Sequence, residues 1–210
     1  TLTLTQCTLS GNSASVGGAI DTFGPLTLTQ CTLSNNSATA GGAIFNGVNS
    51  TLTLTQCTLS NNSATHGGAF FSSGTLTLTQ CTLSSNSASG GGGAIWTNSP
   101  LTLSHCTLSG NSASGGGGAI WTNRALTLTN TIVAGNSAPS GPEIFKLESP
   151  PTTTGKNLIG DLAGSLLTAN PTVIVAADPK LSPLGNYGGP TPTMLPLPGS
   201  PAINPSGGGT

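Results

Sequence analysis

The sequence predicts an all-β fold in which one chain winds into stacked coils, a parallel β-helix or β-solenoid with about 25 residues per coil. The first observation is a repeated phrase, Leu-Thr-Leu-Thr-Gln-Cys-Thr-Leu-Ser, followed by Asn-Ser-Ala and Gly-Gly-Ala-Ile. The second is that apolar and polar residues alternate within the phrase, which is typical of strands. The phrase recurs at intervals of 24, 26, 24, 25 and 25 residues, at Leu2, Leu26, Leu52, Leu76, Leu101 and, in decayed form, Leu126.

Each coil is predicted to contain three short strands separated by corners. Leu2–Leu4 alternates with period two, so that Leu faces inward and Thr faces outward. Cys7–Leu9 alternates again with shifted parity, which places a corner at Thr5–Gln6. A second corner follows at Ser10–Gly11, and a third strand runs through Ala19–Ile20. Three strands make a roughly triangular coil, and equivalent strands of successive coils pair in parallel about 4.8 Å apart.

One Asn occurs at the same place in all six coils and is predicted to form an inward ladder. A side-chain amide stacked on its own kind donates and accepts hydrogen bonds along the stack, which satisfies a buried corner. The alternative is that Asn only suits the turn. The residues are Asn12, Asn36, Asn62, Asn86, Asn111 and Asn136.

Five Cys residues share the inward parity of Leu9, one in each of the first five coils. We expect free buried thiols that pack as small apolar groups, because side chains of an in-register parallel ladder point the same way and bridge poorly. Occasional disulfides and a redox or metal stripe are the alternatives, although the spacing lacks the close pairs of a zinc site. The residues are Cys7, Cys31, Cys57, Cys81 and Cys106.

Charge is almost absent from the repeats. Lys, Arg, Asp and Glu make up 4% of the chain, against roughly 25% in an ordinary domain, and the net charge is −1. Asp21 and Arg124 are the only two before residue 143, and they lie four coils, or about 19 Å, apart. We therefore expect no nucleic-acid binding, no catalytic residue, no metal site and no cofactor. No apolar run approaches the ~18 residues of a membrane span.

The composition changes near residue 146, which divides the chain into two parts. Most of the Pro residues and seven of the nine charged residues lie in the last third, and Pro-rich sequence does not continue regular ladders. We predict a solenoid of six repeats over 1–145, and irregular final coils with a Pro-rich C-terminal cap over 146–210, where 172–176 adds one strand. The first coil has no comparable cap, so we expect upstream sequence or a neighbouring copy to cover its edge.

Several ordered motifs then resemble bacterial choice-of-anchor Q domain proteins. They lie at 126–138, 141–144, 155–161, 178–193 and 197–204. The Gly-Gly-Ala-Ile element is also similar, more weakly, to the repeats of chlamydial polymorphic outer-membrane proteins. The resemblance implies a right-handed, single-stranded parallel β-helix in secreted or surface-attached bacterial proteins, with no single activity. The main departure is Cys where the family usually has Ser.

The outward side of the first strand is predicted to be a hydroxyl ladder. The simplest interpretation is that β-branched Thr suits an exposed strand. The alternatives are a packing face between solenoids and an ordered hydroxyl array that binds ice. A neighbouring Thr column begins at Thr5 and another face begins at Thr8. The ladder itself is Thr3, Thr27, Thr53, Thr77, Thr102 and Thr127.

A second surface is aromatic. One aromatic residue follows the inward residue of the third strand in coils two to six, and Asp21 takes that place in the first coil. If the preceding Ile faces inward, these rings form an outward stripe for a partner or a carbohydrate; with the opposite parity they belong to the core. The residues are Phe45, Phe71, Trp96, Trp121 and Phe145.

The predicted function is a non-catalytic extracellular structural or adhesive β-solenoid, on the bacterial cell surface or secreted, that assembles with copies of itself into a filament or surface layer. Near-identical, uncharged repeats suit self-association better than a unique pocket. The alternatives are a glycan- or partner-binding module that uses the aromatic stripe, and an ice-binding protein that uses the Thr ladders. An enzyme of this fold would need clustered carboxylates that the repeats lack.

Overall fold

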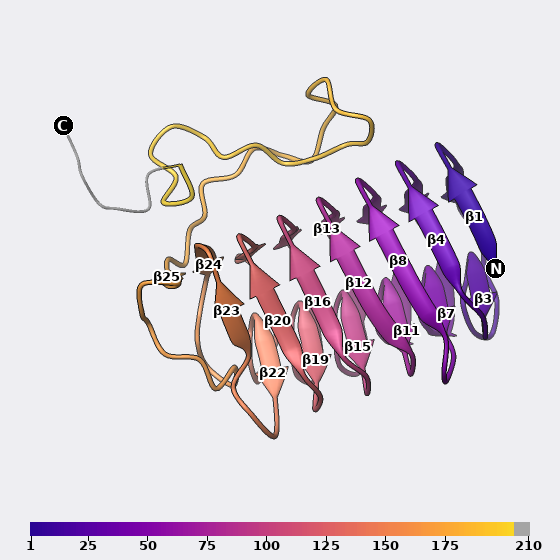
Figure 1. The fold of residues 1–210 in the computed structure, drawn as a ribbon, viewed down its shortest axis with the longest axis horizontal. Coiled ribbons are helices and arrows are strands. Elements are labelled where there is room, and N and C mark those ends of the chain that lie inside the picture. The colour runs from indigo at the N-terminus through magenta and orange to yellow at the C-terminus, as the bar shows by residue number, and fades with distance from the viewer. Residues whose placement is uncertain (204–210) are drawn as a thin grey trace.

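The computed structural model describes residues 1–203 and is a right-handed parallel β-solenoid without helices (Figure 1). Along each coil the chain passes through up to four strands, which stack into four parallel sheets. Sheet 1 contains β1 (Leu2–Thr5), β4 (Leu26–Thr29), β8 (Thr51–Thr55), β12 (Thr75–Thr79), β16 (Leu101–Ser104), β20 (Leu126–Thr129) and β23 (Thr152–Thr154). Sheet 2 contains β2 (Thr8–Ser10), β5 (Thr32–Ser34), β9 (Thr58–Ser60), β13 (Thr82–Ser84), β17 (Thr107–Ser109), β21 (Ile132–Val133), β24 (Asn157–Ile159) and β25 (Val173–Val175).

The remaining two sheets complete the coil and correct the triangular prediction. Sheet 3 contains β6 (Ser37–Ala40), β10 (Ser63–His66), β14 (Ser87–Ala88) and β18 (Ser112–Ala113). Sheet 4 contains β3 (Ile20–Thr22), β7 (Ile44–Asn46), β11 (Phe70–Ser72), β15 (Ile95–Thr97), β19 (Ile120–Thr122) and β22 (Ile144–Lys146). The Ser-Ala segment, which was not predicted as a strand, forms sheet 3 because equal spacing of the coils brings its backbone groups into register.

Identical residues pair across successive coils, which places like side chains on top of one another. In sheet 1, Leu52 pairs with Leu76 and Thr53 with Thr77. The inward Leu side chains of β4 to β20 are 0–2% exposed, so period-two alternation in the sequence becomes a continuous apolar core. Leu2 in β1 is 52% exposed because it lies at the edge of this core.

The corners fall where the alternation changes parity. Gln6, Gln30, Gln56 and Gln80 have φ of 54–55° and turn the chain from sheet 1 to sheet 2. A Gln is unusual in this left-handed region. Its side chain stacks along the corner, since Gln6 Nε2 donates to Gln30 Oε1 at 3.2 Å and Gln30 Nε2 to Gln56 Oε1 at 3.0 Å.

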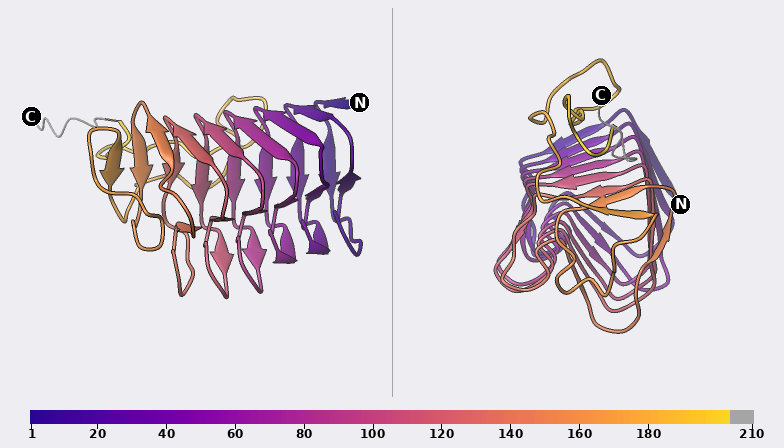
Figure 2. Two further views of the ribbon diagram at one scale, coloured as in Figure 1. Left: turned by 60° about the horizontal axis from the view of Figure 1, so that its bottom comes forward. Right: turned by 90° about the vertical axis from the view of Figure 1, so that its left-hand side faces the viewer.

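The segment after residue 146 continues the solenoid and then leaves it. Strands β23, β24 and β25 extend sheets 1 and 2, and Leu162 and Leu167 pack against the C-terminal end of the core. The part from 178 to 203, here called the tail, then folds back along the outer face of sheet 2 (Figures 1 and 2). The region predicted as a cap therefore covers a side wall as well as the end of the solenoid.

The tail is fixed to sheet 2 by hydrogen bonds between residues distant in the sequence. Thr191 Oγ1 donates to the Gln56 carbonyl at 3.0 Å, the hydroxyls of Thr82 and Thr193 lie 3.1 Å apart, and Thr58 Oγ1 donates to the Pro192 carbonyl. Thr58 and Thr82 of the outward face that begins at Thr8 are therefore covered by the tail, and they are only 1% and 4% exposed.

Candidate contact surfaces and interior ladders

The predicted aromatic residues form an outward column on sheet 4. Their inward neighbours, such as Ile44 and Ile95, are fully buried, whereas the rings are partly exposed. Asp21 pairs with Phe45 and so begins the same column. The outward side chains that lie one above another are Phe45, Phe71, Trp96, Trp121 and Phe145.

Ring stacking determines which part of each aromatic side chain meets solvent. The ring centroids of Phe71 and Trp96 lie 4.3 Å apart and those of Trp96 and Trp121 lie 4.9 Å apart, with planes inclined by 11° and 4°. Each ring face is therefore covered by the next ring, and the column presents ring edges. Phe23 packs on Phe45 at 6.0 Å and is itself 67% exposed; sequence reasoning missed Phe23 because it lies outside the repeat position.

Sheet 1 presents two columns of hydroxyl side chains, which we call the hydroxyl array. Its first column contains the predicted ladder and adds Thr152 from β23, which pairs with Thr127. Each of the fourteen positions in these two columns bears a hydroxyl group, with one Ser among thirteen Thr. The members are Thr3, Thr27, Thr53, Thr77, Thr102, Thr127 and Thr152 in one column, and Thr5, Thr29, Thr55, Thr79, Ser104, Thr129 and Thr154 in the other.

The six Asn side chains lie in a continuous ladder of hydrogen bonds. Asn62 Nδ2 donates to Asn86 Oδ1 at 2.9 Å and to the Leu33 carbonyl at 3.0 Å, and Asn86 Oδ1 also accepts from the Asn62 backbone N–H. The same pattern joins every neighbouring pair from Asn12 to Asn136. Asn36 through Asn111 are at most 1% exposed, so each amide satisfies polar groups that water does not reach.

Glu143 ends this ladder, and sequence reasoning assigned it no role. Its carboxylate accepts from Asn136 Nδ2 at 2.6 Å and from the Gly135 N–H at 3.0 Å. A Cβ on Gly160 would lie 2.2 Å from Glu143 Oε1, so glycine leaves room for the carboxylate. Burial raises the pKa of Glu143 to about 7, against the opposing effect of these N–H donors. The sequence could have pointed to Glu143, because a Glu stands here at the position that holds Ala43 and its equivalents in the other coils.

The Cys side chains line the interior next to the Gln corner. Cys31, Cys57, Cys81 and Cys106 are at most 1% exposed, Cys7 is partly exposed, and all five thiols are free. Burial raises the pKa of the Cys31 thiol, and a hydrogen bond with Cys81 together with burial raises that of Cys57. These two thiols therefore stay protonated at neutral pH, a form that is a poor nucleophile and a poor metal ligand.

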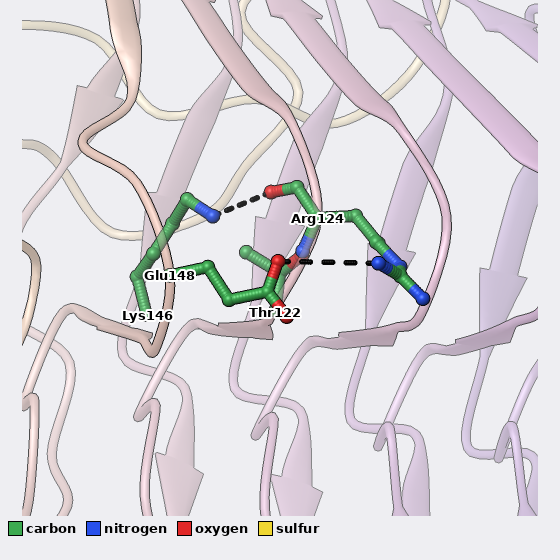
Figure 3. Close-up of polar contacts among 4 residues, drawn as sticks. All are labelled: Thr122, Arg124, Lys146 and Glu148. Carbon is green, nitrogen blue, oxygen red and sulfur yellow. Dashed lines mark hydrogen bonds and ion pairs between the residues drawn. The ribbon is translucent and has the colours of Figure 1, made fainter.

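Arg124, Lys146 and Glu148 form a small polar cluster at one corner. Arg124 Nη1 lies 3.9 Å from Glu148 Oε2, and Lys146 Nζ donates to the Arg124 carbonyl at 2.6 Å (Figure 3). The Arg124 N–H donates to Thr122 Oγ1 at 3.1 Å, and burial lowers the pKa of Lys146. Sequence reasoning paired Arg124 with the distant Asp21 and missed these neighbours one coil away. The ion pair is solvent-exposed and contributes little to stability.

A Ser-His-Asn cluster lies on the surface. Asn130 Oδ1 accepts from the Lys156 N–H at 2.9 Å, and Asn130 Nδ2 lies 3.1 Å from His105 Nε2. His105 Nδ1 lies 2.9 Å from Ser104 Oγ. His66, by contrast, accepts from the Gly91 N–H at 3.4 Å and lies beside Trp96.

A shallow groove of about 810 Å³ runs beside sheet 3. It contains no charged side chain and is lined by Ser87, Ala88, Ser89, Ser112, Ala113, Ser114, Ser137, Ala138 and Pro139. Within residues 1–203, no three His, Cys, Asp or Glu side chains gather closely enough to hold a metal ion. The same residues include no helix long and apolar enough to cross a bilayer.

Two protein-family models match the chain. The model described as a right handed beta helix region matches residues 1–107, and the Chlamydia polymorphic membrane protein repeat matches residues 105–123. No curated protein matches, and no solved structure matches. The two models indicate a surface or secreted β-solenoid protein. Neither covers the motifs after residue 125, so the resemblance to choice-of-anchor Q domain proteins stays a prediction.

Proposed function

The chain belongs to the family of right-handed β-helix regions, and from this premise we propose that it is a non-catalytic scaffold on the bacterial cell surface or outside the cell, which assembles with copies of itself. The observation that favours this function most is the neutrality of the solenoid wall. Over the first 142 residues the only Asp, Glu, Lys or Arg side chains are Asp21 and Arg124. Because such walls do not repel one another, they associate readily.

The aromatic column is the proposed contact between copies. Phe23 and Val48 are 67% and 62% exposed and extend the column to an apolar patch at its N-terminal end. The Phe23 ring lies against Gly47, where a Cβ would be 2.4 Å from it, and Gly47 directly precedes Val48 in the chain. Aromatic residues are enriched at protein interfaces, and an exposed apolar patch of this kind favours a partner.

Glycan binding is the weaker alternative for the same surface. Sugars pack on aromatic ring faces, but each ring from Phe45 to Trp121 stacks on the next at 4.3–5.3 Å. The column therefore presents mainly ring edges. This arrangement supports protein packing more than carbohydrate stacking.

Sedimentation velocity over a concentration series tests the proposal, with negative-stain microscopy of the concentrated sample. We expect the native chain to form higher-mass species as concentration rises, and the Phe23→Ser, Val48→Ser double variant to stay smaller at the same concentration. Leu197→Ser is the matched control, since Leu197 is an exposed apolar residue of the tail. A monodisperse native monomer at high concentration would contradict self-assembly.

A further inference from the structure

We propose that the hydroxyl array of sheet 1 is an ice-binding surface, a function separate from self-assembly. Its ligand is the ordered water at the surface of an ice crystal. The inference depends on four properties of the array: its completeness, its regular spacing, the freedom of its hydroxyl groups to bind water, and the attachment of the tail to sheet 2 instead of sheet 1.

The array is complete over seven strands. It includes β23, whose inward residue is no longer Leu. In β23, Thr153 takes the inward place of Leu128, whereas Thr152 and Thr154 keep the outward hydroxyl groups. Thr153 instead bonds to Thr172, with 2.7 Å between the hydroxyl oxygens. The outward Thr columns therefore continue beyond the Leu ladders that they accompany in the repeats.

The spacing of the array is set by backbone geometry. Rows are separated by one strand spacing of about 4.8 Å, and the two columns by two residues, or about 6.7 Å. The register is residue to residue from β1 to β23, so the hydroxyl groups form a two-dimensional lattice. Oxygen atoms in hexagonal ice repeat over comparable distances, and the restricted χ1 of Thr holds each hydroxyl in place.

Most of these hydroxyl groups are left to water. Thr129 and Thr154 bond to each other at 2.7 Å, and Ser104 bonds to His105. Within residues 1–203 the other members of the array make no side-chain hydrogen bond to the protein. Their donors and acceptors therefore order a first water layer. The Thr methyl groups between them are uncharged and form no hydrogen bonds with water.

Sheet 2 provides an internal contrast. Its outward column begins with Thr8 and Thr32, but the tail covers Thr58 and Thr82. The column then becomes apolar at Ile132, Leu158 and Ile174. Within residues 1–203, none of the tail's hydrogen bonds to the solenoid wall reaches an outward side chain of sheet 1, so sheet 1 keeps an uninterrupted hydroxyl surface.

Thermal hysteresis and ice-recrystallisation assays on the whole chain test this inference. We expect hysteresis above that of an equimolar non-binding protein, and loss of most of it in a Thr53→Lys, Thr77→Lys, Thr102→Lys variant. Thr32→Lys on sheet 2 is the matched control and should leave the hysteresis unchanged. Thr77→Val keeps the branched side-chain shape and removes the hydroxyl group. It should reduce hysteresis without changing the temperature at which the protein unfolds.

Two results would overturn the inference. One is native hysteresis no greater than that of the non-binding protein. The other is equal loss in the sheet 1 variant and in Thr32→Lys. The Phe23→Ser, Val48→Ser variant separates this inference from the proposed function, because it should lose assembly and keep hysteresis. If the sheet 1 lysines abolish assembly and hysteresis is absent, the array binds copies of the chain instead of ice.

Discussion

At the scale of single residues, the interior of the solenoid is specified by hydrogen bonds that pass from one coil to the next. Thr131 shows what the Cys position requires, because it stands where the next Cys would lie. Its hydroxyl donates to the Thr129 carbonyl at 2.9 Å and accepts from the Cys106 N–H at 3.4 Å. A hydroxyl therefore replaces the thiol without leaving a polar group unpaired.

Glu143 makes the stability of the solenoid depend on pH. Its pKa is about 7 in the folded chain, against 4.5 for the free side chain, so folding favours the protonated form. The resulting stabilisation is fully present below about pH 4.5 and is lost as the pH rises through 7, at most about 3 kcal/mol. We expect the urea midpoint to fall between pH 5 and 8. Glu143→Gln should remove that part of the fall, and identical pH profiles for the two proteins would contradict this role.

At the scale of elements, each sheet is stabilised by a ladder of like residues, and the position along the ladder decides how much one residue contributes. The Asn ladder shows this best, because its interior amides have partners on both sides. The first amide, Asn12, is exposed and donates only to Asn36 Oδ1. Stability is then approximately a sum of contacts between neighbouring coils.

Asn86→Ala should destabilise the chain far more than Asn12→Ala. Asn86 accepts two hydrogen bonds from Asn62 and donates to Asn111 and to the Leu59 carbonyl. Its removal leaves buried donors and acceptors unpaired, at a cost of about 3 kcal/mol, whereas loss of Asn12 costs about 1 kcal/mol. Urea unfolding of the two variants measures the difference. Equal midpoints would show that Asn only suits the turn.

At the scale of the whole molecule, the tail joins distant coils by folding back over sheet 2. Thr58 and Pro192 are 134 positions apart in the sequence and share a hydrogen bond. The tail also pairs with itself, since Gly185 and Thr193 exchange two backbone hydrogen bonds of 2.9 Å. Its attachment to the wall therefore depends on a few side-chain contacts rather than on a ladder.

Loss of those contacts should release the tail while the solenoid stays folded. Thr58→Ala with Thr82→Ala removes two hydrogen bonds worth together about 2 kcal/mol, so the detached state becomes more populated. We expect trypsin to cut this variant after Lys180 at least about ten times faster than the native chain, because the cleavage rate follows the population of the state with a detached tail. Thr32→Ala changes the same column outside the tail contacts, so this variant should be cut at the native rate. Equal rates for all three proteins would contradict this attachment.

The repeat pattern alone was enough to predict the parallel solenoid, the period of the coils, the corners at Gln6 and Gly11, and the inward direction of the Leu side chains. This was possible because each coil contacts mainly its neighbours. Alternate residues of a strand point to opposite faces, and in-register pairing places the same residue on the same face in every coil. The same logic identified the hydroxyl columns of sheet 1, although not their seventh row.

Only the tertiary structure decided how non-repeating residues are used. Glu143 ends the Asn ladder because Gly160, one coil later, leaves space for it. The tail covers sheet 2 and leaves sheet 1 open through contacts that span more than a hundred residues. Such contacts have no period, and a Pro-rich segment has no alternation, so nothing local in the sequence points to the surface on which it packs.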